Sequence, residues 1–233
     1  MTLTNNRLLS DIESIIRNIE KDYQRTQGLI LTEDDLKCLI YNKLAFLLKN
    51  RHRPFSRFQQ EDRVNYLPAW KAETIDLGTF ASSVHAEIPW YDEDNKLTIR
   101  PDITILEPNH FSILHGLNGL KLPSKQVEFG GQGIIFEIKF NRFKSGISPK
   151  FFMRIKGDFY KIQGLFERLK NNGKEKDLYC FFIVFNKTDL KCSEFRHFLN
   201  QNRIGIGYRL LYGTGLVRNF GFYPKLDNYD QRY

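Results

Sequence analysis

Residues 133–141, GIIFEIKFN, decide the fold, because apolar side chains occupy every second position of a strand-length stretch. Successive side chains of a β-strand point to opposite faces of the sheet, so the stretch predicts a strand with one wholly apolar face. That face carries Ile134, Phe136, Ile138 and Phe140. The opposite face carries Ile135, Glu137, Lys139 and Asn141. Charges in the middle of an apolar strand are costly to bury alone, so Glu137 and Lys139 are expected to have compensating neighbours.

A hairpin is expected before this strand. Its arms are SVHAEIPW at 83–90 and KLTIRPDITIL at 96–106, joined by a turn at 92–95. One face of the second arm carries Leu97, Ile99, Ile103 and Ile105. Asp102 takes the other face, and Pro101 before it removes a ladder donor, which favours an irregular or edge position. Asp102 is therefore expected on the polar side of the hairpin.

Two adjacent strands can thus direct two carboxylates, Asp102 and Glu137, and the ammonium of Lys139 at one point. Hard oxygen ligands of this kind bind Mg²⁺ and leave positions for water and phosphate, as phosphodiester hydrolysis requires. The expected metal ligands are Asp102, Glu137 and the main-chain carbonyl of Ile138. Lys139 would orient or deprotonate the attacking water, or neutralise charge that develops on the phosphate. The pattern does not choose among these roles.

Helices are expected on both sides of these strands. An apolar stripe predicts a first helix over 8–23. Thr32, with Asp35 three residues later, predicts the N-cap of a second helix that runs to about 47. A third amphipathic stripe predicts a helix over 151–172, and a glycine follows it as a helix terminator.

The remaining segments complete the pattern. The continuous apolar run LYCFFIVFN at 178–186 predicts a strand that is covered on both faces. The stretch 107–133 is rich in glycine and longer than an ordinary connection, which indicates a functional or mobile loop. The last part of the chain predicts a short helix over 194–200 and a β-like segment at 207–213.

The core order is helix, strand, strand, strand, helix, strand, which is typical of an α/β protein with a central mixed sheet flanked by helices. A chain of 233 residues can bury one full core. We expect a single domain, 1–233, with an N-terminal helical extension (1–30), a core (31–188) and a C-terminal elaboration (189–233).

Cysteine usage and hydropathy predict a cytoplasmic protein. The three cysteines are widely spaced and form no CxxC motif, so neither a disulfide framework nor a zinc site is indicated. The N-terminus carries acidic residues within its apolar stretch and lacks a small-residue cleavage site. No apolar run approaches the roughly 18 residues of a membrane span. We therefore expect neither export nor a membrane as partner.

The charge is unevenly distributed. Residues 139–233 hold 19 Lys or Arg against 8 Asp or Glu, within a chain whose formal charge is +8. A polyanion-binding surface needs such an excess, because phosphate contacts dominate nucleic-acid affinity. A well-solvated surface on a basic protein would have the same composition. Nucleic acid is thus an expected partner, although charge by itself does not select it.

The motifs Pro101-Asp102 and Glu137-Ile138-Lys139 together resemble those of the PD-(D/E)xK nuclease superfamily. The resemblance implies a restriction-endonuclease-like αβββαβ core with the motif on its second and third strands, in the element order given above. It implies a metal-dependent endonuclease that hydrolyses phosphodiester bonds, chiefly in DNA, with Mg²⁺ as cofactor and Mn²⁺ as a substitute. Members include restriction enzymes, junction resolvases, transposon end-cleaving enzymes and repair nucleases. Analogy with small enzymes that cut both strands suggests a homodimer.

The resemblance also implies further site residues. Many members use an acidic residue of the first core helix, for which Glu33 is the candidate; the alternative is a first-turn residue that interacts only with the helix dipole. Asp158 and Lys161 would face the site from the following helix in some families. Glu87, on the first strand, is either a further ligand or a solvated side chain. Some relatives keep the fold as non-catalytic nucleic-acid-binding or assembly modules, which is the alternative function.

Overall fold

A computed structural model of the chain describes most of the expected core. The described residues are 6–48, 83–91, 97–106, 111–113, 127–129, 132–171, 173 and 178–215. The turn expected at 92–95 lies outside them. No helix in these ranges is both long enough and apolar enough to cross a membrane.

A six-stranded mixed sheet forms the centre of the described structure, as expected for an α/β protein. Its strands, in spatial order, are β1 (Val84–Ala86), β4 (Ile103–Leu106), β7 (Gly133–Asn141), β8 (Leu178–Asn186), β10 (Tyr208–Thr214) and β9 (Ile204–Gly205). β1, β4 and β7 form an antiparallel meander, while β7, β8 and β10 are mutually parallel. β9 pairs with β10 in the antiparallel sense and ends the sheet.

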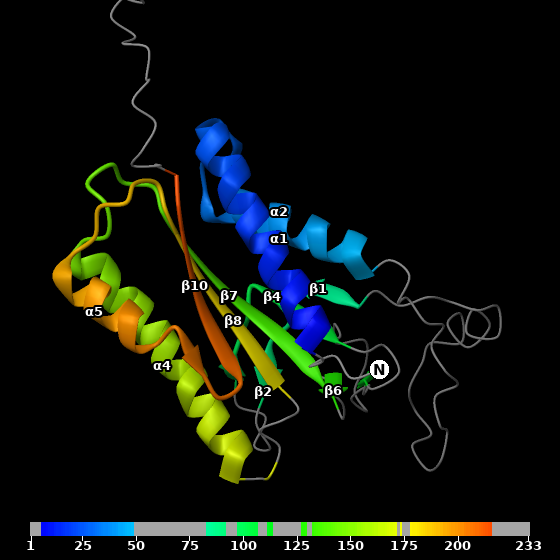
Figure 1. Cartoon of the computed structure of the whole chain (residues 1–233). Coiled ribbons are helices and arrows are strands. Elements are labelled where there is room, and N and C mark those ends of the chain that lie inside the picture. Colours follow the sequence, from blue (N-terminus) through cyan, green and yellow to red (C-terminus); the bar gives the residue numbers. More distant parts are fainter. Residues whose placement is uncertain are drawn as a thin grey trace, which may run out of the picture.

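Helices cover both faces of this sheet (Figure 1). α1 (Asn6–Arg25) and α2 (Glu33–Leu48), joined by a 3-10 turn at Gln27–Leu29, lie on one face. α4 (Pro149–Asn171) and α5 (Ser193–Gln201) lie on the other. The helices expected over 8–23, 32–47, 151–172 and 194–200 are therefore present, within a few residues of their expected ends, whereas the loop or further helix considered around 70–77 lies outside the described residues.

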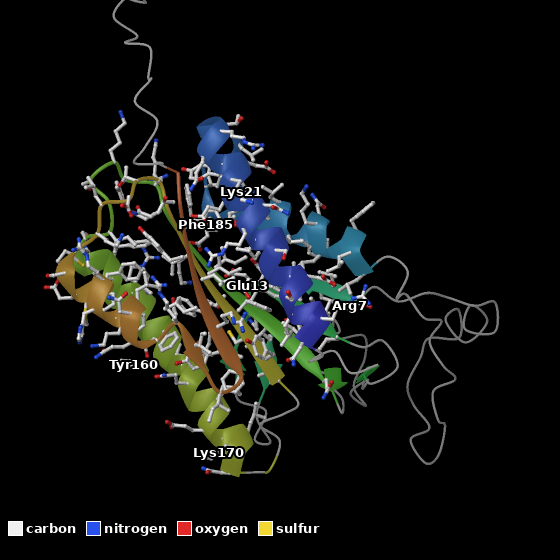
Figure 2. The ribbon with its side chains drawn as sticks, viewed as in Figure 1. Arg7, Glu13, Lys21, Tyr160, Lys170 and Phe185 are labelled. Carbon is white, nitrogen blue, oxygen red and sulfur yellow. The ribbon has the colours of Figure 1, made fainter. Side chains whose placement is uncertain are left out.

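Each layer has its own apolar core. The first core packs α1 and α2 on the sheet, and Figure 2 shows its Phe185 between the sheet and α1. The second core packs α4 and α5 on the opposite face. The first core holds Ile134, Phe136, Ile138 and Phe140 from β7. Ile135 lies in the second core. The expected division of β7 into two faces is thus confirmed, and β8 contributes to both cores, as its continuous apolar run predicts.

The N-terminus of α2 is held by the expected capping box. The Asp35 N–H donates to Thr32 Oγ1 at 3.1 Å, and the Thr32 N–H donates to Asp35 Oδ2 at 2.9 Å. These reciprocal bonds satisfy main-chain donors that a helix leaves without partners at its start. They also set the position of Glu33, the first residue of the helix.

The expected hairpin forms, but each of its arms is divided into two separate strands. β1 pairs with β4 in the central sheet, whereas β2 (Trp90–Tyr91) and β3 (Leu97–Ile99) form a separate two-stranded sheet. The Asp102 N–H donates to the Phe136 carbonyl, and the next residue, Ile103, is itself the partner of Phe136 in the register. Asp102 and Ile103, two consecutive residues, thus lie opposite the single residue Phe136, as in a β-bulge.

The extra residue at this irregularity shifts the alternation of side chains. Ile103 lies in the first core, but Ile99 packs against the second core. The prediction that Ile99 shares a face with Ile103 and Ile105 is therefore wrong, because inserting one residue moves the preceding side chains to the opposite face.

The connection at 107–133 is not entirely a loop. β5 (Phe111–Ile113) and β6 (Val127–Phe129) within it form an antiparallel pair. The expectation of an irregular connection was wrong for these two segments, whose aromatic and β-branched residues favour extended structure.

Candidate active site

The candidate site lies at the edge of β7 where β4 begins. β4 pairs only with residues 133–136 of β7, so it does not cover the carboxyl half of that edge. Two carboxylates bond to the main chain there instead. The Ile138 N–H donates to Asp102 Oδ2 at 2.7 Å, and the Phe140 N–H donates to Glu33 Oε2 at 3.0 Å. Asp102 and Glu33, from distant parts of the sequence, are therefore brought to the same edge, as the motif analysis predicts.

Glu137 and Lys139 form an ion pair beside this edge, on the face covered by α4. Lys139 Nζ lies 2.6 Å from Glu137 Oε1 and 3.1 Å from Asp158 Oδ2. The side chains of Glu137 and Lys139 are only 12% and 13% exposed, so water screens the pair weakly. Lys161, at 67% exposure, reaches the same Asp158 from the outside at 2.8 Å. Glu137 and Lys139 thus have the compensating neighbours that were expected. Asp158 is connected to the site by its ion pair with Lys139.

The electrostatics of Glu137 link it to Asp102. Burial is the main cause that raises the pKa of Glu137, to about 7; Lys139 opposes this shift, and the negative charges of Asp102 and Asp158 add to it. The Asp102 carboxylate therefore acts on Glu137 electrostatically. Close to neutral pH, Glu137 is therefore partly protonated, and a cation beside the two carboxylates would favour its ionised form.

Lys139 remains an ammonium in this environment. Burial by itself lowers its pKa, but the carboxylates of Glu137 and Asp158 outweigh burial, and the pKa is raised above the ordinary value. A charged lysine cannot accept a proton. Of the roles left open by the sequence, neutralising or orienting therefore fits this arrangement better than deprotonating water.

Lys37 is a site residue that the sequence analysis missed. Its Nζ lies 3.2 Å from Asp102 Oδ1 and 2.8 Å from Glu87 Oε1, and both carboxylates raise its pKa against the opposing effect of burial. Lys37 follows Glu33 by four residues, which places the two on the same face of α2. That spacing is the signal that could have identified it.

Glu87 takes a third role besides the two considered for it. It pairs with Lys37 while its side chain remains 56% exposed. Its N–H donates to the Asp102 carbonyl at 3.2 Å, and its φ of 53° is positive, which is uncommon for a residue with a side chain. Glu87 thus supports Asp102 through the main chain and through Lys37.

Replacing Lys37 by alanine is expected to destabilise the protein by about 1–3 kcal/mol, because Asp102, whose side chain is only 15% exposed, loses a charged partner. Urea unfolding at pH 7.5 measures the change. Lys43→Ala, an exposed position on the same helix, is the matched control and should stay within about 0.5 kcal/mol of the wild type. Equal stability of the two variants would show that the ion pairs of Lys37 contribute nothing.

Three oxygen donors at this edge are of the kind that a hard divalent cation prefers. The N–H and carbonyl of a strand residue point toward the same neighbour, so the Ile138 carbonyl faces the edge at which its N–H meets Asp102. The candidate donors are the carboxylates of Asp102 and Glu137 and this carbonyl; in the structure Asp102 Oδ1 pairs with Lys37 and Glu137 Oε1 pairs with Lys139. Among the described residues, no group of three or more His, Cys, Asp or Glu side chains is placed to hold a metal ion. A cation here would complete its shell with water, as Mg²⁺ usually does.

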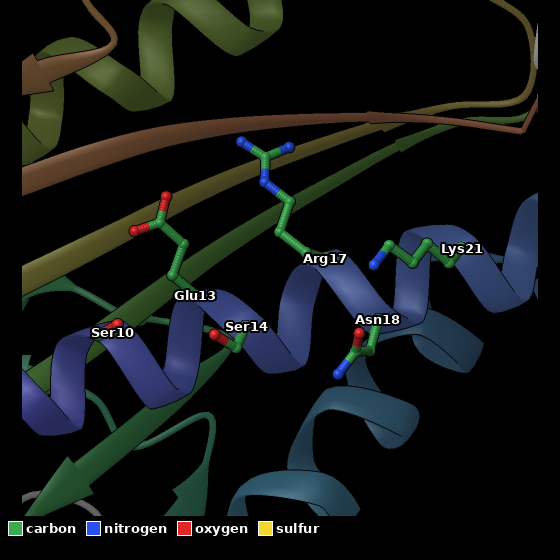
Figure 3. A pocket seen from close by; sticks show the side chains of 6 residues that line it. All are labelled: Ser10, Glu13, Ser14, Arg17, Asn18 and Lys21. Atoms are coloured by element: carbon green, nitrogen blue, oxygen red, sulfur yellow. The ribbon is translucent and has the colours of Figure 1, made fainter.

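An open pocket of about 310 Å³ lies elsewhere, on α1 (Figure 3). Its lining residues are Ser10, Glu13, Ser14, Arg17, Asn18 and Lys21. Glu13 pairs with Arg209, and Arg17 Nη1 donates to the Tyr212 carbonyl at 3.4 Å, so both side chains reach toward β10. These contacts cover the edge of β10 against pairing with another strand, which is a structural role.

Comparison of the chain with protein-family models, with curated proteins and with solved structures finds no match.

Proposed function

We propose that this protein is a Mg²⁺-dependent endonuclease that hydrolyses phosphodiester bonds in DNA, of the PD-(D/E)xK type. One observation carries the proposal: Asp102 bonds to the Ile138 N–H of the strand that bears Glu137 and Lys139, close enough for its charge to raise the pKa of Glu137. Two carboxylates, a main-chain carbonyl and an ammonium at one point are what metal-assisted hydrolysis of a phosphodiester needs.

The order of elements supports a restriction-endonuclease-like core. Apart from the small two-stranded sheets β2-β3 and β5-β6, the elements α2, β1, β4, β7, α4 and β8 run along the chain as helix, strand, strand, strand, helix, strand. β1, β4 and β7 are antiparallel neighbours, and α4 connects β7 to the parallel β8. The Pro-Asp motif directly precedes the second of these strands, and the Glu-x-Lys motif lies on the third.

In this proposal each residue of the site has a separate role. Mg²⁺ held by Asp102, Glu137 and the Ile138 carbonyl would supply Lewis acidity and a water of lowered pKa. Lys139, fixed between Glu137 and Asp158, would place its ammonium against the charge that develops on the phosphate. Glu33 would act as a positioning residue, because its bond to the Phe140 N–H holds the main chain beside the site.

Plasmid cleavage tests the proposal. Purified protein with supercoiled DNA is expected to produce nicked or linear product in Mg²⁺ or Mn²⁺ and none in excess EDTA. Lys139→Ala should cut much more slowly, while Lys43→Ala, purified identically, should cut like the wild type. Linear product in a single binding event would further support a homodimer with two sites.

Two outcomes would count against the proposal. Equal cutting by the wild type and by Lys139→Ala would indicate a contaminating nuclease. Tight DNA binding without cutting under any divalent cation would favour a non-catalytic nucleic-acid-binding module on the same fold.

A further inference from the structure

A surface formed by two loops lies at the carboxyl ends of β7 and β8. It consists of the two loops that follow these strands, 142–148 and 187–192, and is called the Phe143 tip below. Figure 1 shows both loops at the same end of the sheet. The Ile147 N–H donates to the Leu190 carbonyl, and the Cys192 N–H donates to the Ile147 carbonyl, each at 2.9 Å. The two loops are therefore bonded into one unit.

The close approach of the loops depends on Gly146. Its φ is +79°, and a Cβ at this position would lie 2.0 Å from the Leu190 carbonyl oxygen. The Gly146 N–H also donates to the Phe143 carbonyl at 3.1 Å, which closes a turn. Phe143 is thus the first residue of a turn that the Gly146 N–H closes. Ile147, which follows this turn, is buried in the second core.

The surface of the Phe143 tip combines apolar and positive groups. Phe143 is 57% exposed and Leu190 55% exposed. Arg142 places its guanidinium 5.9 Å from the centroid of the Phe143 ring, and Lys144 on the other side is exposed. The one carboxylate of the two loops, Asp189, is paired with Lys191 at 2.7 Å. An exposed aromatic ring flanked by cations complements a stacked base between phosphates.

We propose that the Phe143 tip is a wedge for duplex DNA, with Phe143 inserted at a base step and Arg142 and Lys144 on the flanking phosphates. This inference rests on the proposed function for its choice of ligand. Phe143 follows Lys139 by four residues, a reach of at most about 14 Å. Because duplex DNA rises about 3.4 Å per base pair, the main-chain positions of the two residues span at most about four base-pair steps. Apolar wedges unstack and kink DNA, so the tip would favour sites that are easily deformed.

Binding in EDTA to a duplex with 2-aminopurine at successive positions tests the wedge without requiring cleavage. The wild-type chain is expected to raise 2-aminopurine fluorescence at one step, as the base unstacks. Phe143→Ala should bind about tenfold more weakly and lose the fluorescence rise. Phe143→Trp should restore both. Phe46→Ala is the matched control, because Phe46 is 70% exposed on α2, and it should behave like the wild type.

The outcomes separate this inference from the proposed function. Equal affinity and equal fluorescence for Phe143→Ala and the wild type would overturn the wedge, as would wild-type binding with no fluorescence rise at any position or no duplex binding at all. Failure of plasmid cleavage, with the Phe143 effect intact, would remove the nuclease proposal and leave the wedge standing. Plasmid cleavage together with no effect of Phe143→Ala would remove the wedge and leave the nuclease proposal standing.

Discussion

A Glu137→Gln variant is expected to lose Mg²⁺-dependent DNA cleavage by about 10³-fold and yet to be more stable than the wild type at pH 8. The loss follows from the removal of one of two carboxylate ligands in the proposed metal site. The gain in stability follows from the burial of Glu137 beside Asp102 and Asp158, which raises its pKa from 4.5 to about 7.

The direction of the stability change follows from proton binding. Between pH 4.5 and 7 the folded protein keeps a proton on Glu137 that the unfolded chain releases, so the free energy of unfolding falls as pH rises through this window. Above pH 7 the ionised carboxylate costs on the order of 3 kcal/mol. Glutamine carries no charge and avoids this cost, although Lys139 then retains only Asp158 as a partner.

Urea unfolding in EDTA from pH 4.5 to 8.5 measures the effect, with cleavage assayed in parallel. The wild type should lose stability across the window, and the Glu137→Gln curve should be flatter. Glu167→Gln, an exposed position on α4, is the control and should follow the wild type in both assays. A variant that is inactive and also less stable at pH 8 would show that Glu137 is chiefly a structural ion-pair partner.

The affinity for Mg²⁺ is expected to fall about tenfold for each pH unit below 7 and to level off above it. The reason is competition: a proton and the cation would occupy the same carboxylate, and without metal the pKa of Glu137 is about 7. Between pH 7 and 5 the expected loss is therefore on the order of 10²-fold.

Calorimetric titration with Mg²⁺ or Mn²⁺ in buffers of different ionisation enthalpy measures both affinity and proton release. Near pH 6 almost one proton should leave for each cation bound, and near pH 8.5 almost none. Glu137→Gln should bind weakly and lose this proton release. Tight binding that does not change between pH 5 and 8 would exclude Glu137 as a ligand.

Local sequence patterns were sufficient for much of the fold. β7 and β8 occupy the residues that alternation and a continuous apolar run predict, 133–141 and 178–186. The capping box of Thr32 and Asp35 forms as expected. Each of these features depends on residues within a few positions of one another, so the information is present in a short window.

The positions at which the strands are irregular could not be derived from short windows of sequence. Pro101 indicated a disturbed strand, but the placement of both Asp102 and Ile103 opposite Phe136 depends on the neighbouring strand. For the same reason the shared face expected for Ile99 and Ile103 was wrong. Lys37 was not predicted as a site residue because its partners, Asp102 and Glu87, lie far from it in sequence.

Because side-chain alternation is a local property, sequence patterns were sufficient to place the main helices, β7 and β8, and to assign Glu137 and Lys139 to one face of β7, but not to identify β5 and β6. Only the tertiary structure decided that β4 begins at Ile103 and leaves the Ile138 and Phe140 N–H groups to Asp102 and Glu33. Those bonds join separate segments at a sheet edge, and their formation depends on where a neighbouring strand starts, which no short stretch of sequence encodes.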